Sequence, residues 1–348
     1  MPARPRLSAR TISAVAAATG VAAAGVALQR RHLQTLAKDP DYTRLTRPLG
    51  GHPLTVVSAD GTELHAEAFG PPDAHTVLLA HGWTEQLTFW GPMISRLTDR
   101  GQRVVAYDLR GHGRSGPAVE SDYTLYRFGE DVAAVLDAAV DSDSTHPRAT
   151  IVGHSLGAMS IVAWAGAHDV AARADAAALV NTGLGDLVAG SLLFGELARW
   201  MNHPRLSRAV LGFGAPLVPF SSPVSQALIR YAAFGPSASD GDVAFYERML
   251  IDCPADVRAA CGVALSDLDL WSAVAGLTVP TLVVAGDRDR LTPPEHGCRI
   301  AEALPHPAGL IVLEQTGHMS PLERPRELVE ALGELIDGAA STADAAAV

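Results

Sequence analysis

Ile151-Val152-Gly153-His154-Ser155-Leu156-Gly157 contains the pattern G-x-S-x-G, and this stretch decides the fold. It follows the apolar residues 149–152 and precedes a helical pattern at 158–164, so we predict a strand, a sharp turn and a helix. Strained backbone at Ser155 would push its hydroxyl into an open site, and the flanking glycines avoid a collision within the turn. The Leu156 N–H and the positive end of the helix would then face any group bound to that oxygen.

Strands and helices alternate on both sides of this turn. We predict strands at Leu54–Ser58, Glu63–Phe69, Thr76–Ala80, Val104–Tyr107, Ala149–Val152, Ala177–Val180, Thr281–Ala285 and Leu310–Leu313. We predict helices at Trp90–Arg100, Arg127–Val140, Ala158–Trp164, Pro294–Ala303 and Pro325–Ile336. Short, continuously apolar strands are typical of a parallel sheet that is buried on both faces. The pattern therefore predicts an α/β fold, with a mostly parallel central sheet and helices on both faces.

The alternation is interrupted between residues 183 and 279. This segment is rich in large apolar residues at helical spacing and contains several prolines, which favours an insertion of helices over another strand-helix unit. We therefore divide the α/β core into residues 53–182 and 280–337. The alanine-rich residues 338–348 are predicted to be a disordered tail.

The N-terminal 38 residues differ from the rest of the chain. Arginines flank an uncharged run at residues 11–29, which as a helix would be about 28 Å long, close to the thickness of a bilayer core. We favour a membrane or signal anchor; a cleavable signal peptide and an alanine-rich helix docked on the protein are the alternatives. Localisation is accordingly at a membrane, with secretion or the cytoplasm as alternatives. Residues 39–52 are predicted to be a linker.

Charge and cysteine usage exclude several classes of protein. The net charge of −11 over 348 residues opposes binding to nucleic-acid phosphates. The three cysteines, Cys253, Cys261 and Cys298, show no C-x-x-C spacing, so neither a zinc site nor a dithiol motif is indicated. Cys253 and Cys261 could pair, but buried free thiols are the simpler interpretation.

Candidate partners for Ser155 follow two later strands. A serine hydroxyl needs a base to take its proton and an acid to orient that base. Reacting groups collect at the carboxyl ends of strands in open α/β sheets. Asp287 and Asp289 follow one predicted strand and His318 follows the next. The order Ser155, Asp289, His318 is the nucleophile-acid-base order of one superfamily.

Residues from about 54 to 336 resemble the alpha/beta hydrolase superfamily, within it the branch that carries a helical cap after the sixth strand. The matching motifs are His81-Gly82-Trp83, Asp108-Leu109-Arg110-Gly111-His112-Gly113-Arg114-Ser115, Gly153-His154-Ser155-Leu156-Gly157, Gly286 to Pro293, and Gly317-His318. The resemblance implies Ser155 as nucleophile, His318 as base and Asp289 as acid. It also implies an oxyanion hole formed by the N–H groups of Trp83 and Leu156, and that residues 183–279 are the cap.

Other residues near these motifs have competing interpretations. Asp287 is the alternative acid, although we expect it to shape its loop, and Asp186 is a second alternative. We expect structural roles for His81, His112 and His154. Arg110 and Asp108 are expected to hold loops together.

A serine at the turn points to acyl chemistry, because relatives that open alkyl esters, such as haloalkane dehalogenases and epoxide hydrolases, have aspartate there. We expect an esterase or lipase acting on a small-molecule ester with an apolar acyl group, without metal or organic cofactor. Hydrolysis of C–C bonds, perhydrolysis, acyl transfer and a non-catalytic binding protein are the alternatives. Candidate pocket residues are His81, Gly82, Trp90 and Leu184.

Overall fold

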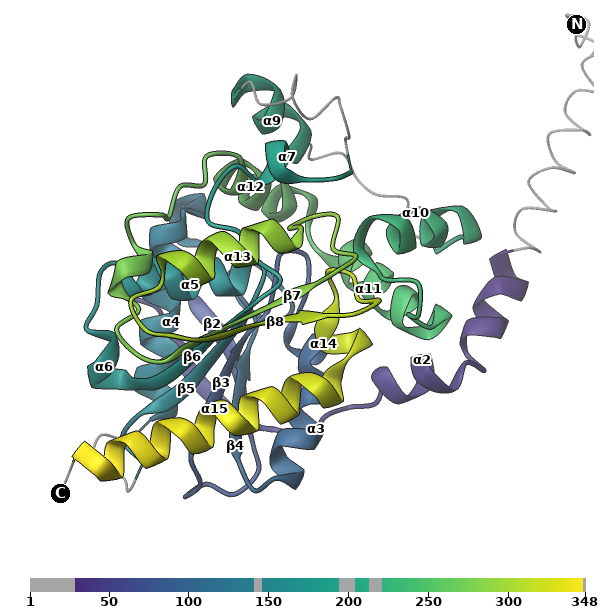
Figure 1. The fold of residues 1–348 in the computed structure, drawn as a ribbon. Helices are drawn as coiled ribbons and strands as arrows, with labels where there is room; N and C mark the ends of the chain where they lie inside the picture. The colour runs from purple at the N-terminus through teal and green to yellow at the C-terminus, as the bar shows by residue number, and fades with distance from the viewer. Residues whose placement is uncertain (1–28, 141–145, 194–203, 213–220, 347–348) are drawn as a thin grey trace, which may run out of the picture.

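The centre of the molecule is an eight-stranded sheet, shown with its flanking helices in Figure 1. The computed structural model describes residues 29–140, 146–193, 204–212 and 221–346. The strands are β1 (His52–Val57), β2 (Glu63–Phe69), β3 (Thr76–Ala80), β4 (Arg103–Tyr107), β5 (Ala149–His154), β6 (Ala174–Val180), β7 (Thr281–Gly286) and β8 (Pro307–Leu313). Their order is β1-β2-β4-β3-β5-β6-β7-β8. Only the β1/β2 and β2/β4 pairs within this sheet are antiparallel, so the predicted mostly parallel sheet is confirmed.

Helices cover both faces of the sheet, as the alternating pattern predicted. Successive side chains of β3 point to opposite faces: Leu78 packs in one core and Leu79 in the other. The first core also contains side chains of α4 (Leu125–Ala139), α5 (Leu156–Ala165) and α13 (Pro294–Ala303). The second contains side chains of α3 (Gly91–Asp99) and α15 (Pro325–Ala346). Short helices α6 (Val170–Arg173) and α14 (Ser320–Glu323) complete the α/β core.

The predicted strands are confirmed, and differences are confined to their ends. β2 and β3 have the bounds expected from the pattern. β6 begins three residues earlier than predicted, at Ala174, and β8 begins at Pro307 instead of Leu310. The added residues are small or polar, so hydrophobicity did not mark them as strand.

A set of helices lies between β6 and β7, where the sequence predicted an insertion. Among the described residues these are α7 (Leu187–Gly190), α9 (Pro204–Leu211), α10 (Pro223–Ala233), α11 (Asp240–Asp252) and α12 (Ala255–Ser266). Ser222 and Ser239 begin α10 and α11: each hydroxyl accepts a hydrogen bond from an N–H of the first turn, which is typical of a helix start. Figure 1 shows these helices gathered beside the sheet and apart from α3 and α15.

Two predicted boundaries are corrected. Residues 39–52 are not a simple linker, because they contain α2 (Pro40–Leu45), which packs on α11 and buries Leu45. The predicted tail is also wrong up to Ala346, because α15 continues to that residue. Alanine is the best helix former, so an alanine-rich end extends a helix whose packed part has already formed. Residues 347–348 lie outside the described residues.

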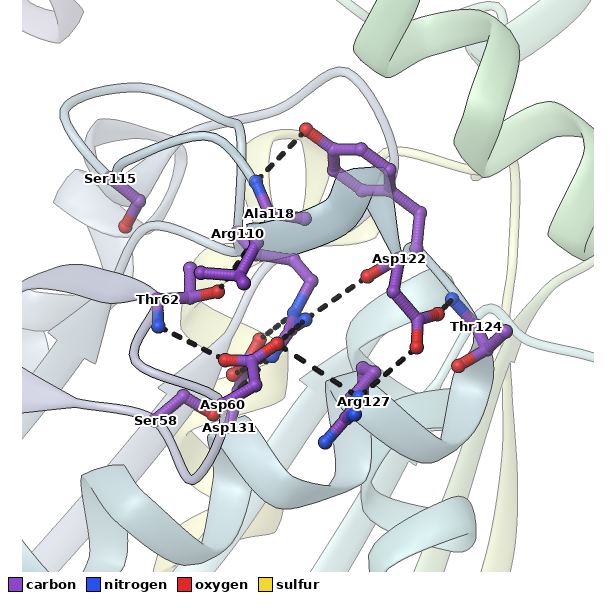
Figure 2. A network of polar contacts seen from close by, with 12 residues as sticks. Ser58, Asp60, Thr62, Arg110, Ser115, Ala118, Asp122, Thr124, Arg127 and Asp131 are labelled. Carbon is purple, nitrogen blue, oxygen red and sulfur yellow. Dashed lines mark hydrogen bonds and ion pairs between the residues drawn. The ribbon is translucent and has the colours of Figure 1, made fainter.

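A buried arginine ties three segments of the first half together (Figure 2). The Arg110 guanidinium makes two hydrogen bonds to Asp131 on α4, of 2.7 and 2.6 Å, and one of 2.9 Å to Asp60 in the β1–β2 turn. It also donates to the Asp122 carbonyl. Burial tends to lower the pKa of Arg110, but its carboxylate partners raise it above its ordinary value. Arg110 therefore holds loops together, as predicted.

No helix within the described residues is both long and apolar enough to cross a membrane. The predicted anchor at residues 11–29 lies outside the described residues except for Gln29.

Candidate active site

Ser155 occupies the strained turn that the sequence predicted. It lies between β5 and α5 with φ 51° and ψ −116°, a conformation that costs a non-glycine residue free energy. A Cβ at Gly153 would lie 2.4 Å from the Ala158 nitrogen, and one at Gly157 would lie 2.1 Å from the Ala80 carbonyl oxygen. Both contacts are impossible, so each position requires glycine. The backbone N–H of Ser155 donates to the Val180 carbonyl at 2.9 Å, which fixes the turn to β6.

Asp289 and His318 meet beside this turn. His318 Nδ1 lies 2.8 Å from Asp289 Oδ2. Both side chains are almost fully buried. Burial raises the pKa of Asp289, but the charge of His318 and the hydrogen bonds that Asp289 accepts lower it below its ordinary value. Asp289 is therefore an ionised carboxylate that orients the His318 ring through Nδ1.

Further hydrogen bonds hold the Asp289 carboxylate in place. Oδ1 accepts from the backbone N–H groups of Leu291 and Thr292, each at 2.9 Å. Oδ2 accepts from the Thr292 hydroxyl at 2.9 Å and from Asn181 Nδ2 at 3.0 Å. Sequence analysis missed Thr292 and Asn181. Asn181 directly follows β6, and this position at the end of a strand was the one feature of the sequence that could have indicated its role.

An apolar cavity of about 320 Å³ joins Ser155 and His318. Both residues line it, together with side chains from α7, α9, α10, α11 and α12. The lining is mostly aliphatic: it includes Met159, Leu187, Val188, Leu193, Leu211, Ile229, Leu250, Leu265, Leu291 and Met319. The Ser155 hydroxyl makes no hydrogen bond within the described residues. Hydrogen bonds in enzyme active sites commonly tighten only when substrate binds.

The backbone N–H groups of Leu156 and Trp83 are the predicted oxyanion-hole donors. Leu156 is the first residue of α5, so its N–H is one of those that a helix leaves without an internal acceptor. Neither this N–H nor that of Trp83 has an acceptor among the residues that the structure describes. Trp83 lines the cavity beside Ser155. Within the described residues, neither N–H group is engaged in a backbone hydrogen bond.

The competing acids lie elsewhere. Asp287 accepts a hydrogen bond from the Thr316 N–H and pairs with Arg288, so it shapes its loop as expected. Asp186 has a largely exposed side chain that pairs with Arg299 at 4.0 Å. Neither contacts His318 within the described residues.

Two neighbouring histidines are neutral and hold loops. His81 Nε2 accepts from the Leu109 N–H at 2.9 Å, and Nδ1 donates to the Gly82 carbonyl. His112 Nε2 accepts from the Thr84 N–H, and Nδ1 donates to the Arg110 carbonyl. Burial lowers the pKa of both rings, for His112 to about 4.

The predicted pocket residues are wrong. His81, Gly82, Trp90 and Leu184 do not line the cavity formed by the described residues. Trp90 and Leu184 are fully buried in the two cores, and His81 is turned toward its own loop. Apolar residues beside a motif fill the core as often as a pocket, and sequence alone does not separate these outcomes. Instead Glu85 and Tyr246, which sequence analysis missed, line the cavity.

The cysteines and the metal-binding side chains indicate no further site. Cys253, Cys261 and Cys298 are free thiols, so the alternative of a bridge between the first two is wrong. The described part of the chain holds no group of three or more His, Cys, Asp or Glu that could bind a metal.

Comparison with known proteins identifies the family. Residues 75–325 match the model of the family described as alpha/beta hydrolase fold. The chain belongs to this family. It is 32% identical over 247 residues to a protein of Variovorax paradoxus named "Putative carbamate hydrolase RutD". The matched residues make up 69% of this chain and 84% of that protein.

Other proteins similar to this alpha/beta hydrolase are named as an esterase or as an esterase/perhydrolase. It is 28% identical over 253 residues to the bifunctional esterase/perhydrolase DCH of Acinetobacter calcoaceticus, covering 68% of this chain and 83% of that protein. Among solved structures, an esterase from Exiguobacterium antarcticum has a TM-score of 0.64 and 19% identity, over 82% of this chain and 99% of that chain. That structure shows the shared fold. The relatives support hydrolase activity for this chain.

Proposed function

We propose that this alpha/beta hydrolase cleaves carboxylic esters with apolar acyl groups, using Ser155, His318 and Asp289. One observation carries the proposal: Ser155, held in strained backbone, lines the same apolar cavity as a histidine whose Nδ1 is fixed by a buried carboxylate. This is the arrangement that makes a serine hydroxyl nucleophilic.

The reaction proceeds in two halves. His318 Nε2 takes the proton from Ser155 as Oγ attacks the ester carbonyl carbon, and the N–H groups of Trp83 and Leu156 stabilise the oxyanion. The tetrahedral intermediate collapses, the alkoxide leaves with the proton from His318, and an acyl-enzyme remains. Water, activated by His318, then attacks this ester and releases the acid together with free Ser155.

The cavity lining favours an apolar acyl group. Each buried methylene of a substrate contributes about 0.8 kcal/mol when it leaves water for such a lining. A volume of about 320 Å³ is at the lower end of the range for small-molecule sites, so we expect short and medium acyl chains rather than bulky lipids.

Perhydrolysis is a second candidate, favoured by the relative named as a bifunctional esterase/perhydrolase. In that reaction hydrogen peroxide replaces water in the second half and releases a peracid. Hydrolysis of C–C bonds and transfer of the acyl group to an alcohol would use the same residues.

Hydrolysis of p-nitrophenyl esters from acetate to decanoate tests the proposal. Ser155→Ala, His318→Gln and Asp289→Asn should each lower kcat by about a thousandfold or more. Asp287→Asn, on the same loop as Asp289, is the matched control and should keep near-wild-type kcat. Loss of activity in Asp287→Asn but not in Asp289→Asn would contradict the assignment, and full activity in Ser155→Ala would refute it. Added peroxide would yield peracid if perhydrolysis contributes.

A further inference from the structure

We propose that the buried pair of Glu85 and His154 is a positioning device, in which a His154 imidazolium links the loop carrying the Trp83 N–H to the loop carrying His318. The inference rests on the proposed function and concerns residues outside the triad. Neither residue is expected to touch the reacting atoms.

The contacts of His154 differ from those of the neighbouring histidines. Nδ1 lies 3.0 and 3.1 Å from the two carboxylate oxygens of Glu85, and Nε2 lies 2.8 Å from the backbone carbonyl oxygen of His318. The backbone carbonyl can only accept, so Nε2 donates; in the proposed ion pair the Glu85 carboxylate accepts from Nδ1 as well, and the ring carries a positive charge. In His81 and His112, by contrast, Nε2 accepts from a backbone N–H, which requires a neutral ring.

Glu85 joins the second loop to this pair. Its Oε2 accepts from the Gly82 N–H at 2.5 Å, one residue before Trp83. Glu85 therefore contacts both the Gly82 N–H and the His154 ring. A continuous chain of hydrogen bonds therefore runs from Gly82 through Glu85 and His154 to His318. It passes next to Ser155, because His154 precedes that residue in the chain.

The side chains of Glu85 and His154 are completely buried, so the pair needs a role other than stabilising the fold. The side chains of His154 and Glu85 have relative exposures of 0% and 1%. Burial lowers the pKa of His154, but the charge and hydrogen bond of Glu85, followed by the His318 carbonyl, raise it above its ordinary value. A buried ion pair adds little to stability compared with apolar side chains of equal size. Positioning of the two loops is a role that apolar replacements would not reproduce.

Charged and aromatic groups lie next to the His154 ring. The charges of Glu85 and Asp289 favour its protonated form, and its own charge disfavours protonation of His81. The His318 ring lies 4.9 Å away between centroids, and the Phe89 ring lies at 5.0 Å. With the imidazolium in place, the His318 backbone is held while its side chain stays free to exchange a proton at Nε2.

Kinetics of Glu85→Gln and His154→Gln give the first test. Both substitutions preserve size and polarity but remove the charge. Displacement of the oxyanion donor or of the base by about 1 Å should lower kcat about a hundredfold, with KM changed by less than about threefold. The wild-type kcat should also fall at high pH as His154 loses its proton, and this fall should be absent in His154→Gln. The control is His168→Gln, which removes a histidine paired with Glu130 at 3.0 Å outside the site and should keep wild-type kcat.

A doubly apolar variant separates positioning from stability. Glu85→Leu combined with His154→Leu removes both charges, so its Tm should recover relative to His154→Leu alone, which leaves Glu85 buried and unpaired. If kcat stays low while Tm recovers, the pair positions the loops. Recovery of kcat together with Tm, or wild-type kcat in both glutamine variants, would overturn the proposal.

Nuclear magnetic resonance of the wild-type protein tests the charge without any substrate. In protein with ¹⁵N-labelled histidine rings, His154 should show protons on both ring nitrogens at neutral pH, and both signals should be missing in His154→Gln. A single ring proton would refute the imidazolium. The NMR result tests the charge on His154 even if the wild-type protein hydrolyses no ester. Absence of ester hydrolysis would contradict the proposed function but not the charge on His154.

Discussion

At the scale of single residues, Asn181 shows how a strand end contributes to the site beyond the three residues of the proposed triad. It adopts φ 46°, a left-handed conformation that asparagine tolerates better than most residues. Its Nδ2 donates to Asp289 and to the Gly317 carbonyl, and its Oδ1 accepts from the Ser320 hydroxyl. The Asn181 amide thus connects Asp289 to the loop that carries His318.

We expect Asn181→Ala to lower kcat/KM by about tenfold or more, because a hydrogen bond to a charged group contributes about 1.5–3 kcal/mol. Asn181→Asp should be more harmful, because a second carboxylate next to Asp289 would raise the pKa of that acid. Steady-state kinetics with a p-nitrophenyl ester measures both effects. Unchanged kcat/KM in Asn181→Ala would show that Thr292 and the backbone N–H groups orient Asp289 without Asn181.

The sequence alone predicted Ser155, Asp289 and His318 because each follows a recognisable strand in a local motif. There is a physical reason why the roles of Asn181 and Glu85 were not predicted. Their partners lie 108 and 69 residues away in the chain, so only the folded sheet brings them together. The pocket residues were wrong because the cavity is lined largely by inserted helices, whose packing leaves no local signature.

At the scale of elements, the short helix α14 links the loop that carries His318 to the inserted helices. Glu323, its last residue, accepts from the Gly235 N–H at 2.8 Å and from the Gly317 N–H at 3.0 and 3.2 Å. Gly235 follows α10 and Gly317 precedes His318. Burial raises the pKa of Glu323 to about 7, although the backbone donors lower it in part.

This pKa predicts a pH dependence of stability. In the unfolded chain the carboxyl loses its proton near its ordinary value of 4.5, whereas in the folded protein it keeps the proton up to about 7. The folded state therefore binds the extra proton between these values, and its free energy of unfolding falls as pH rises through this window, by about 3 kcal/mol. Glu323→Gln cannot titrate, so its stability relative to wild type should rise by that amount from pH 4.5 to pH 8.

Urea unfolding at both pH values measures this difference. Glu314→Gln is the control, because Glu314 is exposed on the same loop and its loss should change stability equally little at the two pH values. If Glu323→Gln and wild type differ in free energy of unfolding by the same amount at pH 4.5 and at pH 8, the carboxyl does not titrate in this window.

At the scale of the whole molecule, the N-terminal segment is part of the hydrolase body from about residue 29 onward. His32 Nε2 lies 3.1 Å from the Ser221 hydroxyl, next to the start of α10, and α2 packs on α11. Figure 1 shows the helical segment that begins at residue 29 lying next to α10 and α11. The sequence suggested a linker here because prolines and glycines flank a helix of only six residues.

We propose that residues 11–29 attach the protein to a membrane, as their uncharged composition predicts. Because the chain that follows is docked on α10 and α11, attachment there would hold the inserted helices near the membrane surface. Membrane fractions from cells that express the protein should retain it after a high-salt wash. Recovery of the full-length chain in the soluble fraction would contradict attachment.

Docking of α2 makes its own prediction for stability. Leu45, the last residue of α2, is 5% exposed and belongs to the core that also contains α3 and α15. Leu45→Ala should lower the free energy of unfolding by about 2–5 kcal/mol, as truncation of buried leucines does. Leu33→Ala is the matched control, because Leu33 lies in the same N-terminal segment but is 47% exposed, and its loss should cost less than about 0.5 kcal/mol. Chemical unfolding of the full-length protein measures both changes in free energy. If Leu45→Ala costs as little as Leu33→Ala, residues 39–52 are a linker, as the sequence predicted.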